Sequence, residues 1–397
     1  MGFKRYTIHL LATSFIVLTI VPAVNWIVDP FWYFRVVEVP GFNEIKPAYH
    51  LYERQVKSAL VAKLHPDAII LGSSFSEIGL SPSNAAFADG GRLRGYNLAV
   101  PWSHGAELYC YALFSLEQPG LKRLVLGGFG TQAEPCTKYQ YLGKPDYTQL
   151  LLSKTAFSAT LKTLHEQGGR QQSTADGMWT YLRYLKGFRN DRDIMSVFAY
   201  TLPKCGSLQK NRGVDIRMIN RSKPATDEST AGLRNIIRLA REKNVQLILI
   251  DYPKHVTYYE QMRACGRMED YWSELWRIAS IVEQEAGADS HQVEFWTFYG
   301  YSEANGERVN AGVPMAERLW QDEAHFNPEV GHVAFDAIFG SKPGFGHKVK
   351  TQDFDRMLAD IENERRTFLH QNPWVLTELE ELRQVAARQK SNPADVQ

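Results

Sequence analysis

Five short apolar runs define the fold that this sequence predicts. They cover residues 67–72, 95–100, 122–128, 245–251 and 292–298. The first, third and fourth are nearly continuous rather than alternating, which is typical of strands buried on both faces of a parallel sheet. Helical patterns lie between the runs, at residues 103–116, 230–244 and 271–287. Strands that alternate with helices predict a doubly wound α/β sandwich.

The N-terminal segment is a second strong constraint. Residues 6–28 contain no Asp, Glu, Lys or Arg, while Lys4 and Arg5 precede them. About 20 apolar residues cross a bilayer as a helix, and flanking basic residues stay on the cytoplasmic side. A cleaved signal peptide is the alternative, but no small-x-small cleavage site follows the run. We therefore expect a single-pass protein of the bacterial inner (cytoplasmic) membrane, with its C-terminal part in the periplasm.

Aromatic side chains follow this segment closely. They are Trp26, Phe31, Trp32, Tyr33 and Phe34. Such residues are enriched where a membrane helix meets water, so the pattern predicts an interfacial aromatic belt.

The rest of the chain divides into three predicted parts after the stub and anchor of residues 1–28. Residues 29–64 are a juxtamembrane linker and helix, and residues 65–350 hold the α/β domain. Residues 137–229 fit the strand–helix rhythm poorly, so we interpret them as a mostly helical insertion, either a lid or a surface pack. Residues 351–397 form a helical tail that Pro373 interrupts.

Charge and cysteine content exclude some classes of function. The chain has 45 basic and 44 acidic residues, whereas nucleic-acid binders usually show a basic excess. We expect no nucleic-acid partner. Its four cysteines match no zinc-binding spacing, and we predict neither a metal nor another cofactor. An oxidising compartment permits disulfides, but the sequence leaves both their pairing and buried free thiols open.

The turn after the first predicted strand carries a candidate nucleophile. Gly72, Ser73 and Ser74 lead from this strand to a helix start, at the sheet edge where α/β proteins bind ligands. Backbone N–H groups at a helix start can stabilise an oxyanion. Serine is also a favoured helix N-cap, so the turn alone is a weak indication.

A second polar pair lies near the end of the α/β domain. Asp322 precedes His325 by three residues, which lets the carboxylate accept a hydrogen bond from the imidazole and orient it. His332 is a weaker candidate for the base. With Ser74, the pair predicts a Ser–His–Asp triad for acyl transfer.

Together these motifs resemble those of the SGNH (GDSL-type) hydrolase and acyltransferase superfamily. The stretches "DAIILGSSFSEIGLSPSNA", "YNLAVPWSHGAE" and "DEAHFNPEVGH" are similar to a membrane-anchored group that includes teichoic-acid D-alanylation and alginate O-acetylation proteins. The resemblance implies a three-layer, flavodoxin-like parallel sheet of about five strands. It also implies Ser74 as nucleophile, His325 as base and Asp322 as its partner. Phe75 stands where this group usually has Arg, and Ser73 where the superfamily has Asp.

The oxyanion-binding positions of the superfamily are less well matched. A Gly after the second strand and an Asn after the third supply these donors in relatives. Here the corresponding candidates are Trp102, Ser103, Gly127, Gly128 and Gln132.

Further polar residues lie at the ends of the second and fourth predicted strands. Asn97 either caps its strand or supports the nucleophile turn. Asp251, Tyr252 and His255 follow the fourth strand onto the same edge, where His255 either contacts substrate or is simply solvated.

These observations predict an extracytoplasmic, serine-dependent acyl-ester hydrolase or O-acyltransferase. The resemblance implies a cell-surface or exported polysaccharide, or another acylated glycan, as substrate and a membrane-bound acyltransferase as a partner. The alternative is an SGNH-like assembly protein with weak or no catalysis, which the missing Asn and Phe75 favour. A phosphoryl-group binder ranks last, because no basic residue accompanies the Gly-Ser-Ser turn.

Overall fold

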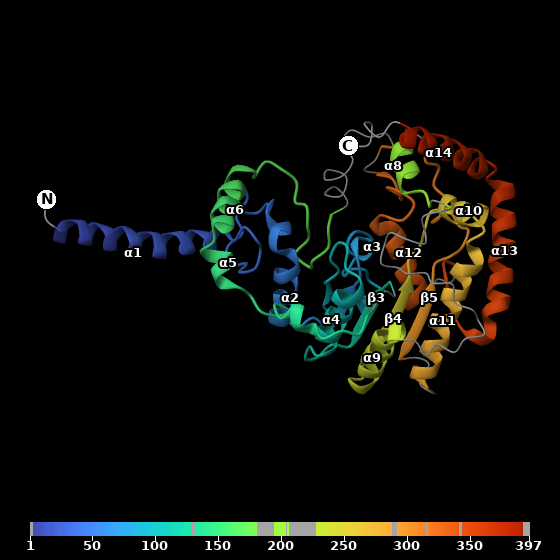
Figure 1. The fold of residues 1–397 in the computed structure, drawn as a ribbon, viewed down its shortest axis with the longest axis horizontal. Coiled ribbons are helices and arrows are strands. Elements are labelled where there is room, and N and C mark those ends of the chain that lie inside the picture. The colour runs from blue at the N-terminus through green and yellow to red at the C-terminus, as the bar shows by residue number, and fades with distance from the viewer. Residues whose placement is uncertain are drawn as a thin grey trace. The chain divides into compact units, whose positions relative to one another are not determined.

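The computed structural model describes most of the chain in two compact units. The described residues are 3–128, 132–180, 194–203, 205, 228–287, 292–310, 312–314, 317–340 and 344–391. The anchor unit combines Met1–Leu64 with Tyr139–Ala175, and the sheet unit combines His65–Lys138 with Asp176–Gln397. Figure 1 shows both units and labels most of their helices and some of the strands.

The sheet unit contains a six-stranded, mostly parallel sheet. Its strands are β1 (Ala68–Leu71), β2 (Gly95–Asn97), β3 (Arg123–Gly127), β4 (Gln246–Asp251), β5 (Val293–Thr297) and β6 (His347–Lys348). Their order is β2-β1-β3-β4-β5-β6, and only β6 runs antiparallel to its neighbour. The prediction of an α/β protein with a parallel sheet is confirmed, and all five apolar runs form strands.

Burial explains why the central strands are continuous apolar runs. All four residues of β1 are buried, and so are the four inner residues of β4. Ile70 pairs in register with Val125, which pairs with Ile248, so these three side chains lie on one face of the sheet.

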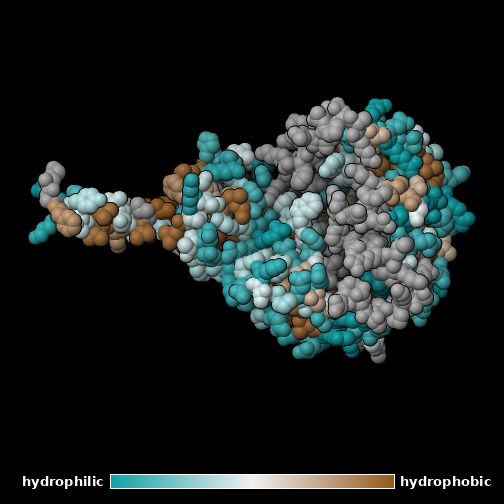
Figure 2. All heavy atoms as spheres, in the orientation of Figure 1, coloured by the Kyte–Doolittle hydropathy of each residue, from teal (hydrophilic) through white to brown (hydrophobic). Residues whose placement is uncertain are grey.

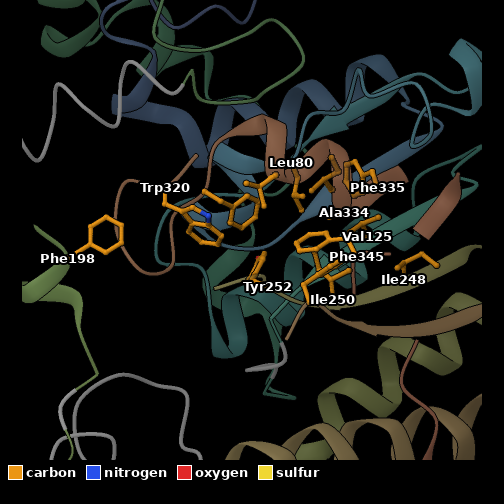
Figure 3. Close-up of a cluster of buried hydrophobic side chains, with 14 of the residues drawn as sticks. Leu80, Val125, Phe198, Ile248, Ile250, Tyr252, Trp320, Ala334, Phe335 and Phe345 are labelled. Atoms are coloured by element: carbon orange, nitrogen blue, oxygen red, sulfur yellow. The ribbon is translucent and has the colours of Figure 1, made fainter. Parts of the chain in front are cut away.

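Helices cover both faces of the sheet. Three helices contact successive strands: α4 (Gly105–Leu116), α9 (Glu228–Glu242) and α11 (Met268–Ala286). The other face holds two helices that contact each other, α3 (Ser74–Gly79) and α12 (Pro328–Phe339). On this second face, Phe335 and Ala334 of α12 pack with Ile70, Val125 and Ile248 in one buried cluster (Figure 3).

The C-terminal tail is helical, as the pattern indicates. It consists of α13 (Phe354–Gln371) and α14 (Trp374–Ser391), with Pro373 between them. Two shorter helices, α8 (Ile194–Thr201) and α10 (Val256–Ala264), pack against α14. Single 3₁₀ turns complete the unit at η2 (Asp89–Gly91), η3 (Cys136–Tyr139) and η5 (Thr351–Asp353).

Two disulfides cross-link the sheet unit. Cys110 of α4 pairs with Cys136, and Cys205 pairs with Cys265 at the end of α10. All four cysteines are therefore paired, which decides between the two possibilities that the sequence left open.

The anchor unit is built around one long apolar helix, α1 (Phe3–Val28). This helix is long and apolar enough to span a membrane. The other elements are η1 (Tyr49–Tyr52), α2 (Glu53–Leu64), α5 (Tyr147–Leu151) and α6 (Lys154–His165). Asn43 Nδ2 and Lys46 Nζ donate hydrogen bonds to the Val28 carbonyl, which satisfies the C-terminal end of α1.

Two expectations about this region need correction. The predicted insertion is divided, because residues 139–175 pack with the N-terminal segment and later residues belong to the sheet unit. Its central parts, residues 181–193 and 206–227, lie outside the described residues. The predicted aromatic belt is also largely wrong. Phe31, Trp32 and Tyr33 are buried in the anchor unit, where Phe31 packs edge-on against Tyr52 with ring centroids 4.7 Å apart.

Candidate active site

The turn after β1 presents Ser74 at the carboxyl edge of the sheet. Here the chain order reverses between β1 and its neighbour β3, which is where open α/β sheets form ligand crevices. Ser74 is the first residue of α3 and is half-buried. Gly72 has φ of 149°, and a Cβ at this position would lie 2.1 Å from Tyr252 Oη. The sequence therefore needs glycine at this point of the turn.

Ser74, His325 and Asp322 form a continuous hydrogen-bonded relay. Ser74 Oγ lies 2.9 Å from His325 Nε2, although the two residues are 251 positions apart. His325 Nδ1 lies 2.7 Å from Asp322 Oδ2. Asp322 is fully buried, whereas the His325 side chain keeps 16% of its surface exposed. The structure thus brings together the three residues predicted as a triad.

A tight loop between Trp320 and Phe326 holds Asp322 and His325 in place. The loop is closed by an antiparallel bridge between those two aromatic residues. Within it, Asp322 Oδ1 accepts hydrogen bonds from the backbone N–H groups of Ala324 and His325, at 2.8 and 2.7 Å. The short Asp-x-x-His spacing is therefore a self-contained turn whose carboxylate orients the ring that follows it.

The relay has the polarity required of a general base. Asp322 is an acceptor, so the proton on the imidazole lies on Nδ1 and leaves Nε2 as an acceptor. Nε2 then accepts the hydrogen bond from the Ser74 hydroxyl. This arrangement can remove the hydroxyl proton while Asp322 stabilises the imidazolium that forms.

Aromatic rings and a lysine border the relay. The Phe75 ring lies 4.5 Å from the His325 ring and 5.2 Å from the Tyr252 ring, measured between centroids. Lys254 Nζ lies 4.2 Å from the Phe75 centroid. Burial lowers the pKa of Lys254 to about 8, although the nearby Asp251 and Asp322 carboxylates oppose this shift. Sequence reasoning missed Lys254, whose only signal was its place just after β4.

Tyr252 fixes the nucleophile turn from the end of β4. Its Oη lies 2.8 Å from Ser76 Oγ, which in turn donates to the Leu71 carbonyl. Burial raises the pKa of Tyr252 to about 12, so its hydroxyl stays protonated at neutral pH. The phenol also fills the space beside Gly127, where a Cβ would lie 2.1 Å from Oη. Any side chain at Gly127 would therefore clash with this phenol.

The other predicted oxyanion donors are mostly engaged in the framework. The Ser103 N–H donates to the Val100 carbonyl and the Gly128 N–H to the Ile250 carbonyl, both at 3.2 Å. Trp102 is 64% exposed and has a positive φ of 61°. Gln132 is exposed, and its backbone N–H donates to the Gly105 carbonyl. Residues 129–131, between Gly128 and Gln132, lie outside the described residues.

Asn97 supports the nucleophile turn. Its Nδ2 donates to the carbonyls of Ser76 and Leu80, both at 2.9 Å, and its Oδ1 accepts from the Ala99 N–H. One buried amide thus links the end of β2 to the last turn of α3. Both roles considered for Asn97 match these contacts, because Oδ1 turns the chain at the strand end and Nδ2 holds the nucleophile helix.

His255 does not match the expected substrate contact, because it is completely buried. Its Nδ1 bonds Thr257 Oγ1 at 2.8 Å, and its Nε2 bonds the Glu307 carbonyl at 2.6 Å. Burial lowers its pKa to about 4, so the ring is neutral at physiological pH. His332 is exposed on α12.

A buried carboxyl group lies directly beside the relay. Glu323 follows Asp322, and its Oε1 lies within hydrogen-bond distance of Thr257 Oγ1, at 3.3 Å. Burial, together with the Asp322 charge, raises the pKa of Glu323 well above its ordinary value. In the described part of the chain, no group of three or more His, Cys, Asp or Glu side chains is arranged to hold a metal ion.

Comparison with protein families and with curated proteins identified no relative of this chain. No protein-family model matches the sequence, and no curated protein matches it significantly.

Proposed function

We propose that this chain is an SGNH-type serine esterase or O-acyltransferase. The relay supports the proposal, above all the 2.9 Å separation of Ser74 Oγ and His325 Nε2. The parallel strand order β2-β1-β3-β4-β5 supports a flavodoxin-like arrangement, with Ser74 beside its switch point. If Ser74 only capped a helix, or if His325 were only a surface residue, the two side chains would have no reason to lie within hydrogen-bond distance.

The reaction follows from the polarity of the relay. Ser74 Oγ attacks the ester carbonyl carbon while its proton passes to His325 Nε2. The tetrahedral intermediate then collapses, the alcohol leaves with the proton from His325, and the acyl group remains on Ser74. Water or a sugar hydroxyl next loses its proton to His325 and takes the acyl group, and His325 returns that proton to Ser74 Oγ as the acyl–serine bond breaks. The products are a free acid in the first case and a new ester in the second.

The location of the reaction follows from two features. The apolar α1, which carries Lys4 and Arg5 in its first turn, supports an anchor in a bacterial inner membrane, with the sheet unit in the periplasm. Two disulfides support the same side of the membrane, because disulfides persist in oxidising compartments. The resemblance to polysaccharide-modifying proteins favours a surface or exported glycan as the acylated partner.

A fluorophosphonate probe tests the nucleophile directly. We expect the full chain in detergent to be labelled, and Ser74→Ala and His325→Ala to lose labelling together with p-nitrophenyl acetate turnover. Ser73→Ala tests the neighbouring serine, which hydrogen-bonds Tyr252 rather than His325. Labelling that persists in Ser74→Ala and disappears in Ser73→Ala would show that Ser73, and not Ser74, is the nucleophile. An unlabelled, inactive but folded wild type would contradict the enzyme proposal.

The second proposal is a non-catalytic partner protein of a polysaccharide modification or export system, such as one that binds a membrane-bound acyltransferase. The specific observation in its favour is that the N–H groups of Ser103 and Gly128 already donate to framework carbonyls. Loss of one oxyanion donor costs about 2.7–4 kcal/mol of transition-state stabilisation. Absence of labelling combined with retained folding favours this proposal over the first.

A further inference from the structure

One face of α6 exposes apolar side chains beside the end of α1. Phe157, Leu161 and Leu164 are each between 38% and 53% exposed. Their spacing of four and three residues places them on one side of the helix. Leu152, just before α6, is also exposed. These four residues are called the α6 stripe.

The side of α6 that adjoins the stripe packs inside the anchor unit. Ala156, Ala159, Thr160 and Thr163 are all buried. Thr160 Oγ1 donates a 2.6 Å hydrogen bond to Asn25 Oδ1, and Asn25 Nδ2 donates a 2.7 Å hydrogen bond to the Leu151 carbonyl. Asn25 is fully buried. These contacts fix α6 to the last turn of α1.

The length of α1 sets the depth of that contact. The helix has 26 residues, whereas about 20 residues suffice to cross the hydrocarbon core of a bilayer. If the apolar stretch begins at Tyr6, the core ends near Asn25. A helix attached to Asn25 then lies at the level of the lipid headgroups. Figure 2 shows hydrophobic residues along α1 and again around α5 and α6 where α1 ends.

The charges on α6 also match an anionic lipid surface. The helix contains no acidic residue, and Lys154 and His165 flank the stripe on its solvent side. Both are exposed, as is Lys162 further round the helix. A helix with an apolar face and a basic flank is typical of segments that lie in the membrane interface. Long basic side chains there can extend from the apolar zone to the headgroups.

We propose that the α6 stripe inserts into the outer headgroup region of the same bilayer that α1 crosses. The anchor unit is then held by two contacts, a spanning helix and an interfacial helix, rather than by α1 alone. The inference rests on the proposed anchor but not on catalysis. It also explains why α6 exposes large apolar side chains while the aromatic residues after α1 are buried.

Site-specific fluorescence tests this insertion in the full chain. Because all four native cysteines are in disulfides, one introduced cysteine gives one reactive thiol for an NBD label. We compare Leu161→Cys with Thr155→Cys, which is exposed on the other side of α6. The protein is placed in nanodiscs of phosphatidylethanolamine and phosphatidylglycerol that contain lipids with a doxyl quencher near the headgroup.

We expect Leu161→Cys to be quenched at least threefold more strongly than Thr155→Cys, with a blue-shifted emission. Leu18→Cys reports on the anchor itself and should be quenched by doxyl groups deep in the acyl chains. Equal, weak quenching at residues 161 and 155 together with deep quenching at residue 18 would overturn the α6 insertion while leaving the anchor intact. Absence of quenching at all three positions would overturn both.

Discussion

The hydroxyl of Tyr252 lies 2.8 Å from that of Ser76, and this contact joins the end of β4 to the first turn of the nucleophile helix. The same phenol occupies the space beside Gly72 and Gly127, at the ends of β1 and β3. One buried side chain therefore defines how three neighbouring strand ends meet under Ser74. The precision of the relay depends on this support, because Ser74 lies on a helix of only six residues.

We expect Tyr252→Phe to slow probe labelling while the protein remains folded. The substitution removes the hydroxyl that hydrogen-bonds Ser76 and Ser73, and each such buried bond contributes about 0.5–1.5 kcal/mol to the free energy of unfolding. Ser76 Oγ keeps its bond to the Leu71 carbonyl, so the turn loosens rather than collapses. Urea denaturation measures the stability, and the second-order labelling rate measures the position of Ser74.

Tyr258→Phe is the matched control for this substitution. It also removes a phenol hydroxyl from a ring near Lys254, whose Nζ lies 5.8 Å from the Tyr258 ring centroid, whereas the Tyr252 hydroxyl bonds Ser76. A labelling rate that falls equally in both variants would contradict a specific role for Tyr252.

Asp322→Asn should abolish most activity without unfolding the protein. An amide in place of the carboxylate can donate to Nδ1, which favours the imidazole tautomer with its proton on Nε2. That tautomer cannot accept the Ser74 proton. In a comparable triad this exchange costs about 10⁴-fold in turnover, so we expect a loss of about 10³–10⁴-fold in p-nitrophenyl acetate hydrolysis. A variant that keeps more than a tenth of the activity would show that Asp322 does not orient the base.

Glu323→Gln, one residue further on, should make the protein more stable than the wild type, and this advantage should grow as the pH rises. The unfolded chain ionises Glu323 near its ordinary pKa, while burial keeps it protonated in the folded state. Above that ordinary pKa the folded state binds more protons, so the free energy of unfolding of the wild type falls with rising pH. Gln carries no such proton. The difference in urea midpoint between variant and wild type should therefore grow from pH 5 to pH 8. A constant or shrinking difference would refute the burial of a protonated Glu323.

Lys254 should make the free energy of unfolding depend on pH in the opposite direction, and at higher pH than Glu323. Burial lowers its pKa to about 8, so the folded protein releases this proton before the unfolded chain does. Between pH 8 and the ordinary lysine pKa the unfolded state binds more protons, and the free energy of unfolding rises with pH. For a half-buried ammonium, this increase in the free energy of unfolding across the interval is of the order of 1–3 kcal/mol.

Lys254→Met lacks this titrating group and keeps much of the packing on the Phe75 ring. The stability of the wild type minus that of Lys254→Met should therefore increase between pH 7.5 and pH 10. Other groups near Lys254 also titrate or carry charge, including Asp251, Asp322, Tyr252 and Tyr258. Both proteins contain these groups, so their contributions to the pH dependence largely cancel in the difference. If the difference in stability between the two proteins did not change with pH, Lys254 would have an ordinary pKa.

The five main strands and the Ser74, Asp322 and His325 positions could be predicted from sequence because their signals are local. Continuous apolar runs reveal strands buried on both faces, and a polar turn after such a run must reach the carboxyl edge of the sheet. The two-residue β6 has no periodicity to detect. His255 looked like any polar loop residue, and only the fold shows that its ring is enclosed by Thr257 and Glu307.

Contacts between distant segments account for what the sequence could not supply. Whether the N–H groups of Ser103 and Gly128 are engaged depends on carbonyls that the fold brings near. The α6 stripe has the same spacing as a core-facing helix, so its exposure cannot be deduced from periodicity. The aromatic residues after α1 suggested lipid contact by composition, but packing against η1 determines their burial.

The two disulfides should contribute slightly unequally to stability, because the stabilisation rises with the logarithm of the length of chain that each one closes. Cys110 and Cys136 are 26 residues apart, and Cys205 and Cys265 are 60 apart. Loop-closure entropy predicts stabilisation of about 3–4 kcal/mol for the shorter loop and slightly more for the longer one. We expect the double variants Cys110→Ser/Cys136→Ser and Cys205→Ser/Cys265→Ser each to lower the thermal midpoint, with the second decrease at least as large. Peptide mapping without reduction verifies the pairing first. If reduction of the wild type left its thermal midpoint unchanged, the cross-links would not support the fold, and the oxidising location that they favour would lose this argument.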